Sequence, residues 1–330
     1  MENKFFWGII GLGKIAQKFA QDLDYVEFAN LSAVASTSLE RAKKFSKTFD
    51  VPHTYTNYAD LLACPNLDAV YIATPHTSHA ELTMMCLKAN IPVLCEKPFG
   101  MNRTQVQAMI HTAQVYDTFL MEAMWTRFLP TTQKLLQLIE ADTIGDIRLV
   151  QADFGYYAPF DPESRIFNAE LGGGSLLDVG IYPAFLSLLL LGAPTDIKAA
   201  AHIGKSNVDE TCAAVLTHQN GAITTFHSSI VAKTPTIAII YGERGHIKIH
   251  GRFHEPNDGL TIQLYNGQRE QIEFDWPSRG YHYEALEVMR CVRAGLKQSP
   301  LLPLDFSLQL ITLLDDIRHT AGIKYPFLAE

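Results

Sequence analysis

The chain has 330 residues, more than one hydrophobic core ordinarily organises, and this length predicts two domains. Hydrophobic residues make up 47% of the chain and charged residues 19%, a composition typical of globular proteins with large buried cores. The formal net charge of −8 argues against a nucleic-acid-binding protein, because such proteins usually carry a basic patch or stripe.

The first third of the chain alternates short apolar runs with segments of helical pattern. This repeated strand–helix–strand order predicts a parallel, doubly wound sheet with helices on both faces. The predicted strands are 5–11, 30–36, 68–74, 91–98 and 118–123, and the predicted helices are 14–24, 39–49, 57–63, 77–89 and 102–116. We therefore expect a dinucleotide-binding Rossmann domain over residues 1–122.

The sequence GLGKIA at 11–16 follows the first strand and opens the first helix. In such a loop Gly11 permits the tight turn, Gly13 lets the backbone approach a pyrophosphate, and Ala16 keeps the helix close to the sheet. An ordinary tight strand–helix turn is the alternative, and the position of the loop after a first strand favours nucleotide binding. The loop residues expected to contact the cofactor are Gly11, Gly13, Lys14 and Ile15.

The end of the second strand indicates which nicotinamide dinucleotide is bound. An NAD site usually has an acidic residue here for the ribose 2′-hydroxyl, but the sequence ASTSLERA at 35–42 begins with small and hydroxyl residues. These hydroxyls and Arg41 favour a 2′-phosphate and hence NADP, with NAD as the alternative. A solvated helix residue is the other interpretation of Arg41. The expected contacts are Ser36, Thr37, Ser38 and Arg41.

Two charged residues end the apolar run at 91–95, where Glu96 and Lys97 precede Pro98. Glutamate and lysine are seldom buried, whereas ligands bind at the carboxyl ends of the strands in doubly wound sheets. We therefore expect Lys97 to face a ligand and Glu96 to orient Lys97.

Two groups of histidines raise the question of a metal site: His76 and His79, and His246, His250 and His254. No carboxylate or cysteine accompanies the first pair at metal-ligand spacing, and the second group falls in strand and turn contexts. Structural or surface histidines and no bound metal are the prediction.

The pattern changes after about residue 123, where strands follow one another with turns between them. The predicted strands are 147–157, 196–204, 209–219, 221–232, 236–243, 245–251, 260–266 and 271–276, and the predicted helices are 175–191, 281–296 and 305–321. We expect an α/β domain over residues 123–330 with an open, mostly antiparallel sheet.

The segment GGGSLLDVGIYP at 172–183 contains the second candidate for chemistry. The glycines permit close backbone approach, and Ser175 is predicted to cap the helix that follows. Asp178 and Tyr182 are four residues apart and share a helix face. A tyrosine ordinarily ionises near pH 10, and a nearby ammonium such as that of Lys97 would lower this value. The alternative is a surface tyrosine and a first-turn aspartate.

Taken in order, G-x-G-x-x-A, T-P-x-x-x-H, E-K-P and G-G-G-x-x-x-D-x-G resemble the motifs of the glucose–fructose oxidoreductase/inositol dehydrogenase/MocA (Gfo/Idh/MocA) family. The segments at 119–130, 176–183 and 299–318 are most similar to the dimeric dihydrodiol dehydrogenases and the NADP-dependent D-xylose dehydrogenases. The resemblance implies hydride transfer between a nicotinamide and a hydroxyl-bearing carbon of a sugar, polyol or dihydrodiol. It also implies a homodimer formed through the open sheet.

The resemblance assigns Lys97 to the reacting centre and places Tyr182 where many members have histidine. Thr37 stands where NADP-using members have arginine. Tyr182 is the first choice for proton transfer, with Lys97 lowering its pKa, and Lys97 acting directly is the second. The remaining expected cofactor contacts are Thr74, Pro75, His79, Glu96 and Lys97. The expected substrate residues are Trp125, Arg127, Phe154, Tyr157, Asp178 and Tyr182, and for the aromatic ones core packing is the alternative.

Two other classes of function are compatible with a nucleotide loop. A non-catalytic, nicotinamide-binding redox regulator needs the loop but has no use for the E-K-P lysine and the tyrosine, and an enzyme acting on an amine or imine would use both. The five cysteines are odd in number and include no C-x-x-C pair, which predicts a cytoplasmic protein. The longest apolar stretch is shorter than the roughly 20 residues of a membrane span, so no membrane partner is expected.

Overall fold

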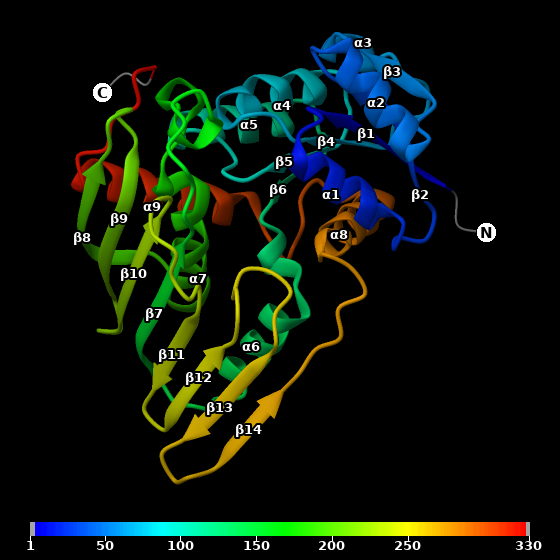
Figure 1. Ribbon diagram of the computed structural model, residues 1–330. Helices are drawn as coiled ribbons and strands as arrows, with labels where there is room; N and C mark the ends of the chain where they lie inside the picture. Colours follow the sequence, from blue (N-terminus) through cyan, green and yellow to red (C-terminus); the bar gives the residue numbers. More distant parts are fainter. Residues whose placement is uncertain (1–3, 328–330) are drawn as a thin grey trace. The chain divides into compact units, whose positions relative to one another are not determined.

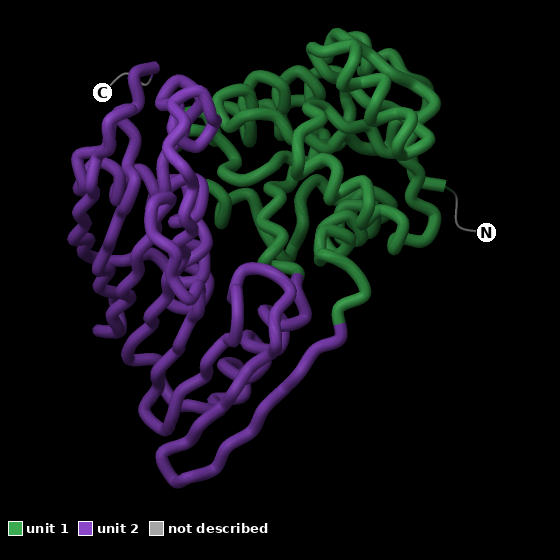
Figure 2. Tube along the Cα trace, viewed as in Figure 1, with its two compact units in different colours: residues 1–128, 276–308 green, residues 129–275, 309–330 purple. Residues whose placement is uncertain are grey.

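The described residues, 4–327 in a computed structural model, fall into two units with one sheet each (Figures 1 and 2). Unit 1 comprises Met1–Phe128 and Trp276–Leu308, and unit 2 comprises Leu129–Asp275 and Gln309–Glu330. The predicted domains, 1–122 and 123–330, differ from this division mainly because residues 276–308 return to unit 1.

The sheet of unit 1 has six parallel strands in the spatial order β3-β2-β1-β4-β5-β6. Apolar runs such as FFWGII in β1 are almost wholly buried, because α4 and α5 cover one side of the sheet and α1 and α8 the other (Figure 1). The strands are β1 (Phe5–Ile10), β2 (Ala29–Ala35), β3 (His53–Tyr55), β4 (Ala69–Ile72), β5 (Val93–Glu96) and β6 (Leu120–Ala123). This strand order is that of a dinucleotide-binding sheet, and the predicted fold class is confirmed.

Helices connect these strands near the predicted positions. They are α1 (Lys14–Leu23), α2 (Leu39–Phe49), α3 (Tyr58–Leu61), α4 (His79–Lys88) and α5 (Arg103–Val115), with a 3-10 turn at His76–Ser78 and another at Trp125–Phe128. The helix expected over 57–63 is only one turn long. No prediction covered β3, a three-residue edge strand.

The returning segment of unit 1 contains α8 (Tyr281–Arg293), which is held by a side chain of α1. The carboxylate of Asp22 accepts hydrogen bonds from the Tyr281 amide at 2.8 Å and from the Ser278 hydroxyl at 2.9 Å. Farther along, the Leu120 amide donates to the Lys297 carbonyl at 3.1 Å. These contacts join residues more than 170 positions apart and explain why the domain boundary is not a single point in the sequence.

The sheet of unit 2 has eight strands in the order β14-β13-β12-β11-β7-β10-β9-β8. All neighbouring strands are antiparallel except β7 and β10, as the prediction of a mostly antiparallel sheet requires. The strands are β7 (Ile147–Gly155), β8 (Pro194–Ile203), β9 (Asp209–His218), β10 (Ile223–Ser229), β11 (Ala238–Gly242), β12 (Gly245–Ile249), β13 (Leu260–Leu264) and β14 (Arg269–Ile272).

Helix α7 (Ile181–Leu191) follows one π-helical turn at Leu176–Gly180 and packs against β7 and β10. The longer segment Ala169–Leu191 is apolar enough to span a membrane by length and composition, which the sequence prediction did not recognise. However, 83% of its most apolar window is buried inside the protein, as in the core helix of a globular unit. The other long helices are α6 (Pro130–Glu140), which no prediction covered, and α9 (Leu304–Thr320).

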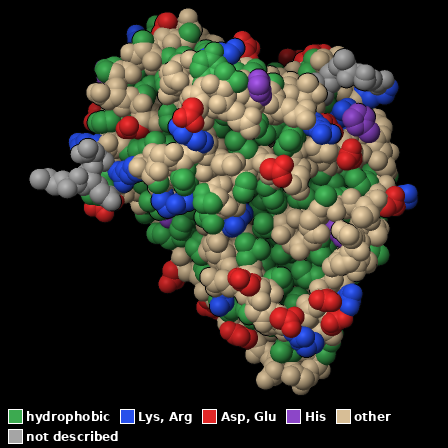
Figure 3. Space-filling model, turned by 180° about the vertical axis from the view of Figure 1, so that it is seen from behind, with side chains coloured by type: hydrophobic (Ala, Val, Ile, Leu, Met, Phe, Trp, Pro, Cys, Tyr) green, Lys and Arg blue, Asp and Glu red, His purple; other side chains and the backbone are tan. Residues whose placement is uncertain are grey.

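Charged side chains of both signs are interspersed on the face of the protein shown in Figure 3. This distribution agrees with the small net charge of −8 over 330 residues.

Candidate functional site

The glycine loop of unit 1 lies where β1, β2 and β4 end together. Gly11 has a φ of +88°, and its amide donates to the Ala35 carbonyl at 3.0 Å. A Cβ at Gly11 would lie 2.7 Å from the Thr74 side chain and 2.8 Å from the Ala73 backbone. The turn therefore requires glycine for both its conformation and its close approach to β4.

Gly13 has a different environment at the first turn of α1. Nothing lies within 4 Å of a Cβ built on Gly13, whose φ of −81° suits any residue. No side chain caps α1, so the amides of Lys14 and Ile15 at its N-terminus have no side-chain acceptor. An open cradle beside uncapped amides fits the pyrophosphate of a dinucleotide.

A cavity of about 400 Å³ lies beside the loop, between α1 and α2. Ser38 is the N-cap of α2 and accepts a hydrogen bond from the Arg41 amide at 3.3 Å. Arg41 lines the cavity, and so does Lys44, which lies one turn farther along the same helix. Of the other predicted residues, Ser36 is buried and bonds to the Ser38 amide. Lys44 was not predicted, although its i+3 spacing from Arg41 places both cations on one face of α2.

His79 was predicted to lie near the nicotinamide, and in unit 1 its ring is fully buried. Nδ1 lies 2.8 Å from the Pro98 carbonyl and Nε2 lies 3.0 Å from the Thr74 carbonyl. The ring thus ties the residues after β4 to the residues after β5. Pro75 is exposed at the same edge of the sheet. No cluster that could hold a metal ion occurs among residues 4–327.

Glu96 ends β5 in a buried position and is fixed on both sides. One carboxylate oxygen accepts a short hydrogen bond from the Tyr71 hydroxyl, and the other accepts from the Lys97 amide at 3.2 Å. The Lys97 side chain is partly exposed, and the Lys97–Pro98 peptide bond is cis. The predicted charged pair therefore separates into a buried, anchored Glu96 and an accessible Lys97.

Glu122 on β6 supports the loop that follows Lys97, and the sequence analysis missed it. Its side chain is 2% exposed, and Oε1 accepts a hydrogen bond from the Phe99 amide at 3.1 Å. Burial raises the pKa of Glu122 to about 7, although the Phe99 amide and the Lys97 charge oppose this shift.

We expect Glu122 to make the free energy of unfolding depend on pH. The folded chain keeps this proton until about pH 7, whereas the unfolded chain releases it near pH 4.5, so stability is lost as the pH rises between these values. The shift corresponds to about 3 kcal/mol. Urea unfolding of the wild type and of Glu122→Gln across this range measures the effect as the difference between the two curves. Parallel curves would show that the carboxyl keeps an ordinary pKa.

The candidate residues of unit 2 gather around Asp178. Its Oδ2 accepts a hydrogen bond from the Tyr156 hydroxyl at 3.0 Å, and its Oδ1 pairs with the Arg165 guanidinium at 2.9 Å. Neither partner was predicted: Tyr156 directly follows β7, within the strand predicted over 147–157, and Arg165 lies in the loop beyond it. By contrast, the predicted Tyr157 points away and is 67% exposed, since neighbouring residues of a strand face opposite sides.

Tyr182 lies on α7 in an aromatic cluster of unit 2. Its ring centroid is 5.6 Å from that of Phe154, which was predicted to contact substrate, and 4.5 Å from that of His254. His254 also stacks on Phe154 at 4.1 Å and is 3% exposed. The expectation of a structural histidine fits His254, but its contact with Tyr182 could not be read from the sequence.

Asp209 on β9 positions the segment that carries Asp178. Its Oδ2 accepts from the Leu176 amide at 2.7 Å and from the Ser175 hydroxyl at 2.9 Å. Ser175 is the N-cap residue of the helical segment, as predicted, but its side chain makes no capping hydrogen bond, because its hydroxyl donates to Asp209 instead. A Cβ on Gly174 would lie 2.1 Å from Oδ1 of Asp209, which explains the last glycine of the G-G-G run.

Two predicted substrate residues belong to unit 1. The Trp125 ring stacks on Tyr281 with centroids 4.3 Å apart, and it is 5% exposed. Arg127 donates from Nε to the Leu301 carbonyl at 2.7 Å, and burial lowers its pKa. Both contacts hold the returning segment, and the roles of these residues toward substrate stay predictions.

Two family models match the chain, one in each part. The first, described as an oxidoreductase family with an NAD-binding Rossmann fold, matches residues 5–123. The second, the GFO/IDH/MocA C-terminal domain, matches residues 132–248. The chain belongs to the Gfo/Idh/MocA oxidoreductase family. It is therefore an NAD(P)-binding oxidoreductase, which confirms the predicted enzyme class, cofactor and family resemblance.

Several relatives within this family align with nearly the whole chain. Trans-1,2-dihydrobenzene-1,2-diol dehydrogenase of Mus musculus is 34% identical and that of Danio rerio 35% identical; each alignment covers 97% of this chain. The alignments cover 98% and 97% of these relatives. Because the relatives are named as dehydrogenases, the family favours an enzyme over a redox regulator.

Solved structures of the family have the same fold. The 3-ketoreductase from Actinomadura kijaniata, in complex with NADP and TDP-benzene, is 26% identical with a TM-score of 0.86. The match covers 96% of this chain and 98% of the ketoreductase chain. An aldose–aldose oxidoreductase from Caulobacter crescentus with glycerol, 24% identical, has a TM-score of 0.87, and the match covers 97% of this chain and 98% of that chain. At this identity it supports the fold alone.

Proposed function

We propose that this family member catalyses the NADP-linked oxidation of a hydroxyl-bearing carbon in a sugar, polyol or dihydrodiol, and the reverse reduction. The observation that carries the proposal is the accessible Lys97 at the carboxyl end of β5, the same sheet edge that bears the glycine loop. The relatives named as dihydrodiol dehydrogenases support this substrate class.

Oxidation of an alcohol removes a hydride from carbon and a proton from oxygen. A bound nicotinamide supplies the carbon that accepts the hydride. Tyr182 takes the proton of the substrate hydroxyl, and the Lys97 ammonium stabilises the oxygen as negative charge develops on it. Direct proton transfer to Lys97 is the second form of the proposal.

The Asp178–Arg165 pair gives a reason to propose a diol or polyol. Asp178 is 8% exposed, whereas the Arg165 side chain is 38% exposed, and a guanidinium carries five N–H donors. A guanidinium held by a carboxylate presents fixed donors to a hydroxyl next to the reacting one. Simple alcohols, which lack that second hydroxyl, are expected to be poorer substrates.

A turnover screen tests the proposal. The reduction of NADP and of NAD is followed by absorbance with pentoses, hexoses, polyols, cyclic trans-diols and amines as candidate substrates. We expect turnover with a member of the sugar, polyol or diol classes. Turnover confined to amines, or none with any class, would contradict the proposal.

The preference for NADP is expected to depend on both cations beside Ser38. Arg41→Ala and Lys44→Ala should each weaken NADP binding by about tenfold, since a charge-assisted contact to phosphate contributes about 1.5 kcal/mol or more. NAD binding should stay within about twofold, because NAD lacks the 2′-phosphate. Calorimetric titration of both dinucleotides measures the difference, and Lys18→Ala on the exposed side of α1 is the control. An equal loss for both dinucleotides would contradict the assignment.

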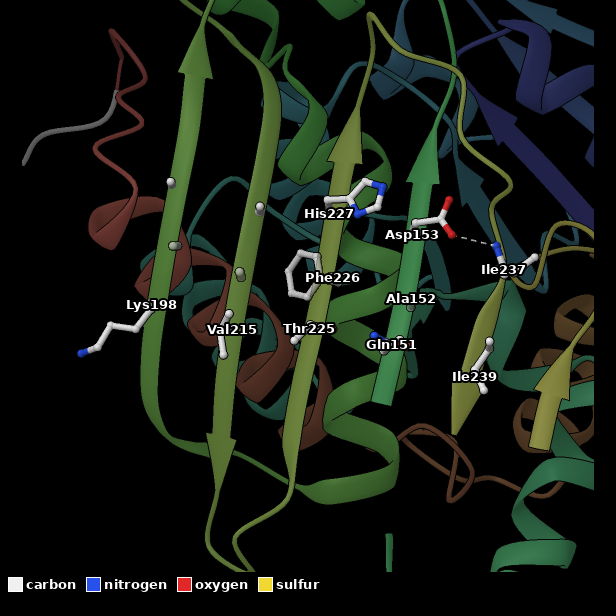
Figure 4. A pocket seen from close by; sticks show the side chains of 14 residues that line it. Gln151, Ala152, Asp153, Lys198, Val215, Thr225, Phe226, His227, Ile237 and Ile239 are labelled. Carbon is white, nitrogen blue, oxygen red and sulfur yellow. Dashed lines mark hydrogen bonds between the residues drawn. The ribbon is translucent and has the colours of Figure 1, made fainter. Parts of the chain in front are cut away.

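We further propose that the enzyme is a cytoplasmic homodimer that pairs through the open face of the unit 2 sheet. A shallow concavity of about 630 Å³ on this face is lined by side chains of five neighbouring strands, among them Val215, Thr225 and His227 (Figure 4). Val215 is 42% exposed, and alanines line much of the rest, a surface that association would bury. The five cysteines are free, buried thiols, which supports a reducing compartment.

A charge on this face is expected to prevent pairing. Val215→Glu should convert the dimer to a monomer in sedimentation equilibrium, because the carboxylate would be desolvated in the interface. Val115→Glu is the matched control, since Val115 is 62% exposed on α5 of unit 1. A wild-type chain that sediments as a monomer, or a Val215→Glu variant that stays dimeric, would contradict the proposal.

A further inference from the structure

The two backbone contacts of His79 are ones that a neutral histidine cannot make together. His79 is 0% exposed, its Nδ1 lies 2.8 Å from the Pro98 carbonyl oxygen, and its Nε2 lies 3.0 Å from the Thr74 carbonyl oxygen. A carbonyl oxygen only accepts hydrogen bonds, whereas a neutral imidazole has one nitrogen that donates and one that accepts. Both contacts are therefore hydrogen bonds only when each ring nitrogen carries a proton.

A neutral ring would make one of the two contacts repulsive. The lone pair of its unprotonated nitrogen would face the lone pairs of a carbonyl oxygen at 2.8 or 3.0 Å, with no hydrogen between them. The distance of 2.8 Å to Pro98 is at the short end for an N–H···O hydrogen bond, as is usual when the donor is charged. The geometry therefore favours the imidazolium form of His79.

Two features of the position oppose a positive charge on His79. The ring is withdrawn from water, and His79 is the first residue of α4, where the end of the helix favours negative charge. Such a charge needs hydrogen bonds and a counter-charge, and Glu96 supplies the counter-charge. Its two oxygens accept from the Tyr71 hydroxyl and from the Lys97 amide, as those of an ionised carboxylate do.

The turn that carries Lys97 is held by buried side chains at three consecutive residues. The amides of the residues before and after Pro98 donate to Glu96 at 3.2 Å and to Glu122 at 3.1 Å. His79 binds the Pro98 carbonyl, and its second hydrogen bond fixes this turn to the turn that follows β4. The backbone that presents Lys97 is thus fixed at successive polar groups.

We propose that His79 is a doubly protonated imidazolium and a positioning residue for Lys97. The inference rests on the proposed function, since it concerns the turn that presents Lys97 to the substrate. The two N–H groups lock the turn after β5 to the turn after β4, so the ammonium of Lys97 starts from a fixed backbone. The ring keeps both protons throughout the reaction, because a hydrogen bond to the backbone holds each of them.

Magnetic resonance of the free protein tests the protonation state without turnover. The spectrum of a chain whose histidines carry the heavy nitrogen isotope is recorded at about pH 8, where an ordinary histidine, with a pKa near 6.5, is neutral. We expect a ring with a proton on each nitrogen and two similar nitrogen shifts, and His79→Gln should lack this signal. A neutral ring has one unprotonated nitrogen, whose shift lies far from that of the other.

The wild-type spectrum also assigns the signal independently of the variant. The two ring protons of His79 are buried, so they should exchange slowly with water and should show contacts with protons of Thr74 and Pro98. A His79 ring with one unprotonated nitrogen would overturn the inference, whatever the activity of the enzyme.

His79→Gln tests the positioning role, because the single nitrogen of glutamine cannot bind both carbonyls. At saturating NADP we expect kcat to fall by about tenfold, less than the 10²–10⁴ expected of a direct participant, and the KM for substrate to change by less than about twofold. In the Lys97→Met background the same substitution should leave kcat unchanged, because His79 acts through Lys97. Equal losses in both backgrounds would show a general structural effect and overturn the role.

His111→Gln is the matched control, since it makes the same change at an exposed histidine of α5. It should alter neither kcat nor the imidazolium signal. Wild-type kcat in His79→Gln would also overturn the positioning role. Absence of dehydrogenase turnover in the wild type would instead contradict the proposed function, and the spectrum would still decide whether His79 is an imidazolium.

Discussion

Lys97→Met is expected to lower kcat by about 10²–10⁴-fold, the usual contribution of a group that assists proton transfer. Methionine keeps the length of the lysine chain and removes its charge, so the oxygen of the substrate loses its electrostatic stabilisation. The fold should be unaffected, because the Lys97 side chain is partly exposed and the Glu96–Tyr71 pair is independent of it. Steady-state rates at saturating cofactor measure the effect.

Tyr182→Phe is expected to lower kcat by a similar factor, because it removes only the hydroxyl that takes the proton. The aromatic packing with Phe154 and His254 is kept, which separates chemistry from stability. Tyr157→Phe is the matched control, since Tyr157 is 67% exposed and bonds to no residue of the Asp178 cluster. A loss in the Lys97 variant alone would select direct proton transfer by Lys97.

The pair of variants also tests the site as a whole. Tyr182→Phe should bind NADP within about threefold of the wild type by calorimetry, because Tyr182 belongs neither to the glycine loop nor to the cavity at Arg41, whereas Lys97 is itself an expected cofactor contact. Near-normal turnover by both variants, with a substrate that the wild type oxidises, would show that the reaction uses other residues. Lys18→Met, an exposed lysine of α1, controls for the loss of one positive charge.

The fold of unit 1 was predictable because its signals are local. Each buried strand reads as an apolar run, and each helix carries its own polar face, so period and length alone placed them within a few residues. β3 was not predicted, because His53 and Thr54 are exposed at the sheet edge and the strand contains no apolar run. The return of residues 276–308 to unit 1 could not be predicted for another reason. It depends on contacts such as that of Asp22 with Tyr281, which join residues 259 positions apart in the chain.

The candidate site could be predicted where a sequence motif fixes the backbone conformation. It could be predicted less well where contacts between side chains determine the arrangement of the site. The loop at Gly11 and Gly13 and the end of β5 follow from strand–turn–helix geometry. In contrast, the sequence could not show that Tyr156 and Arg165 bind Asp178. Arg165 lies in a loop whose path no short-range pattern specifies, and the contact of Tyr156 joins residues 22 positions apart.

The two loop glycines are expected to differ in how much their substitution changes the stability of the fold. Gly11→Ala should lower the free energy of unfolding by about 2–4 kcal/mol, since its positive φ alone costs a side chain about 1–2 kcal/mol and the Cβ would press on the backbone of Ala73. Gly13→Val should change stability by less than about 1 kcal/mol, because the space around its Cβ is open and its backbone suits any residue. Thermal and urea unfolding measure both effects.

The affinity for NADP tests the role of Gly13 separately from its effect on stability. A valine at Gly13 fills the cradle in front of the Lys14 and Ile15 amides, so NADP should bind at least about 100-fold more weakly, a loss of about 2.7 kcal/mol. Since this variant is folded, the loss reports on the pyrophosphate site and on nothing else in unit 1. Lys18→Val is the control, because it places the same side chain on α1 outside the cradle. Gly192→Val is unsuitable as a control, because the positive φ of Gly192 would strain a valine. If Gly13→Val binds NADP as tightly as the wild type, the open space beside α1 is not where the pyrophosphate lies.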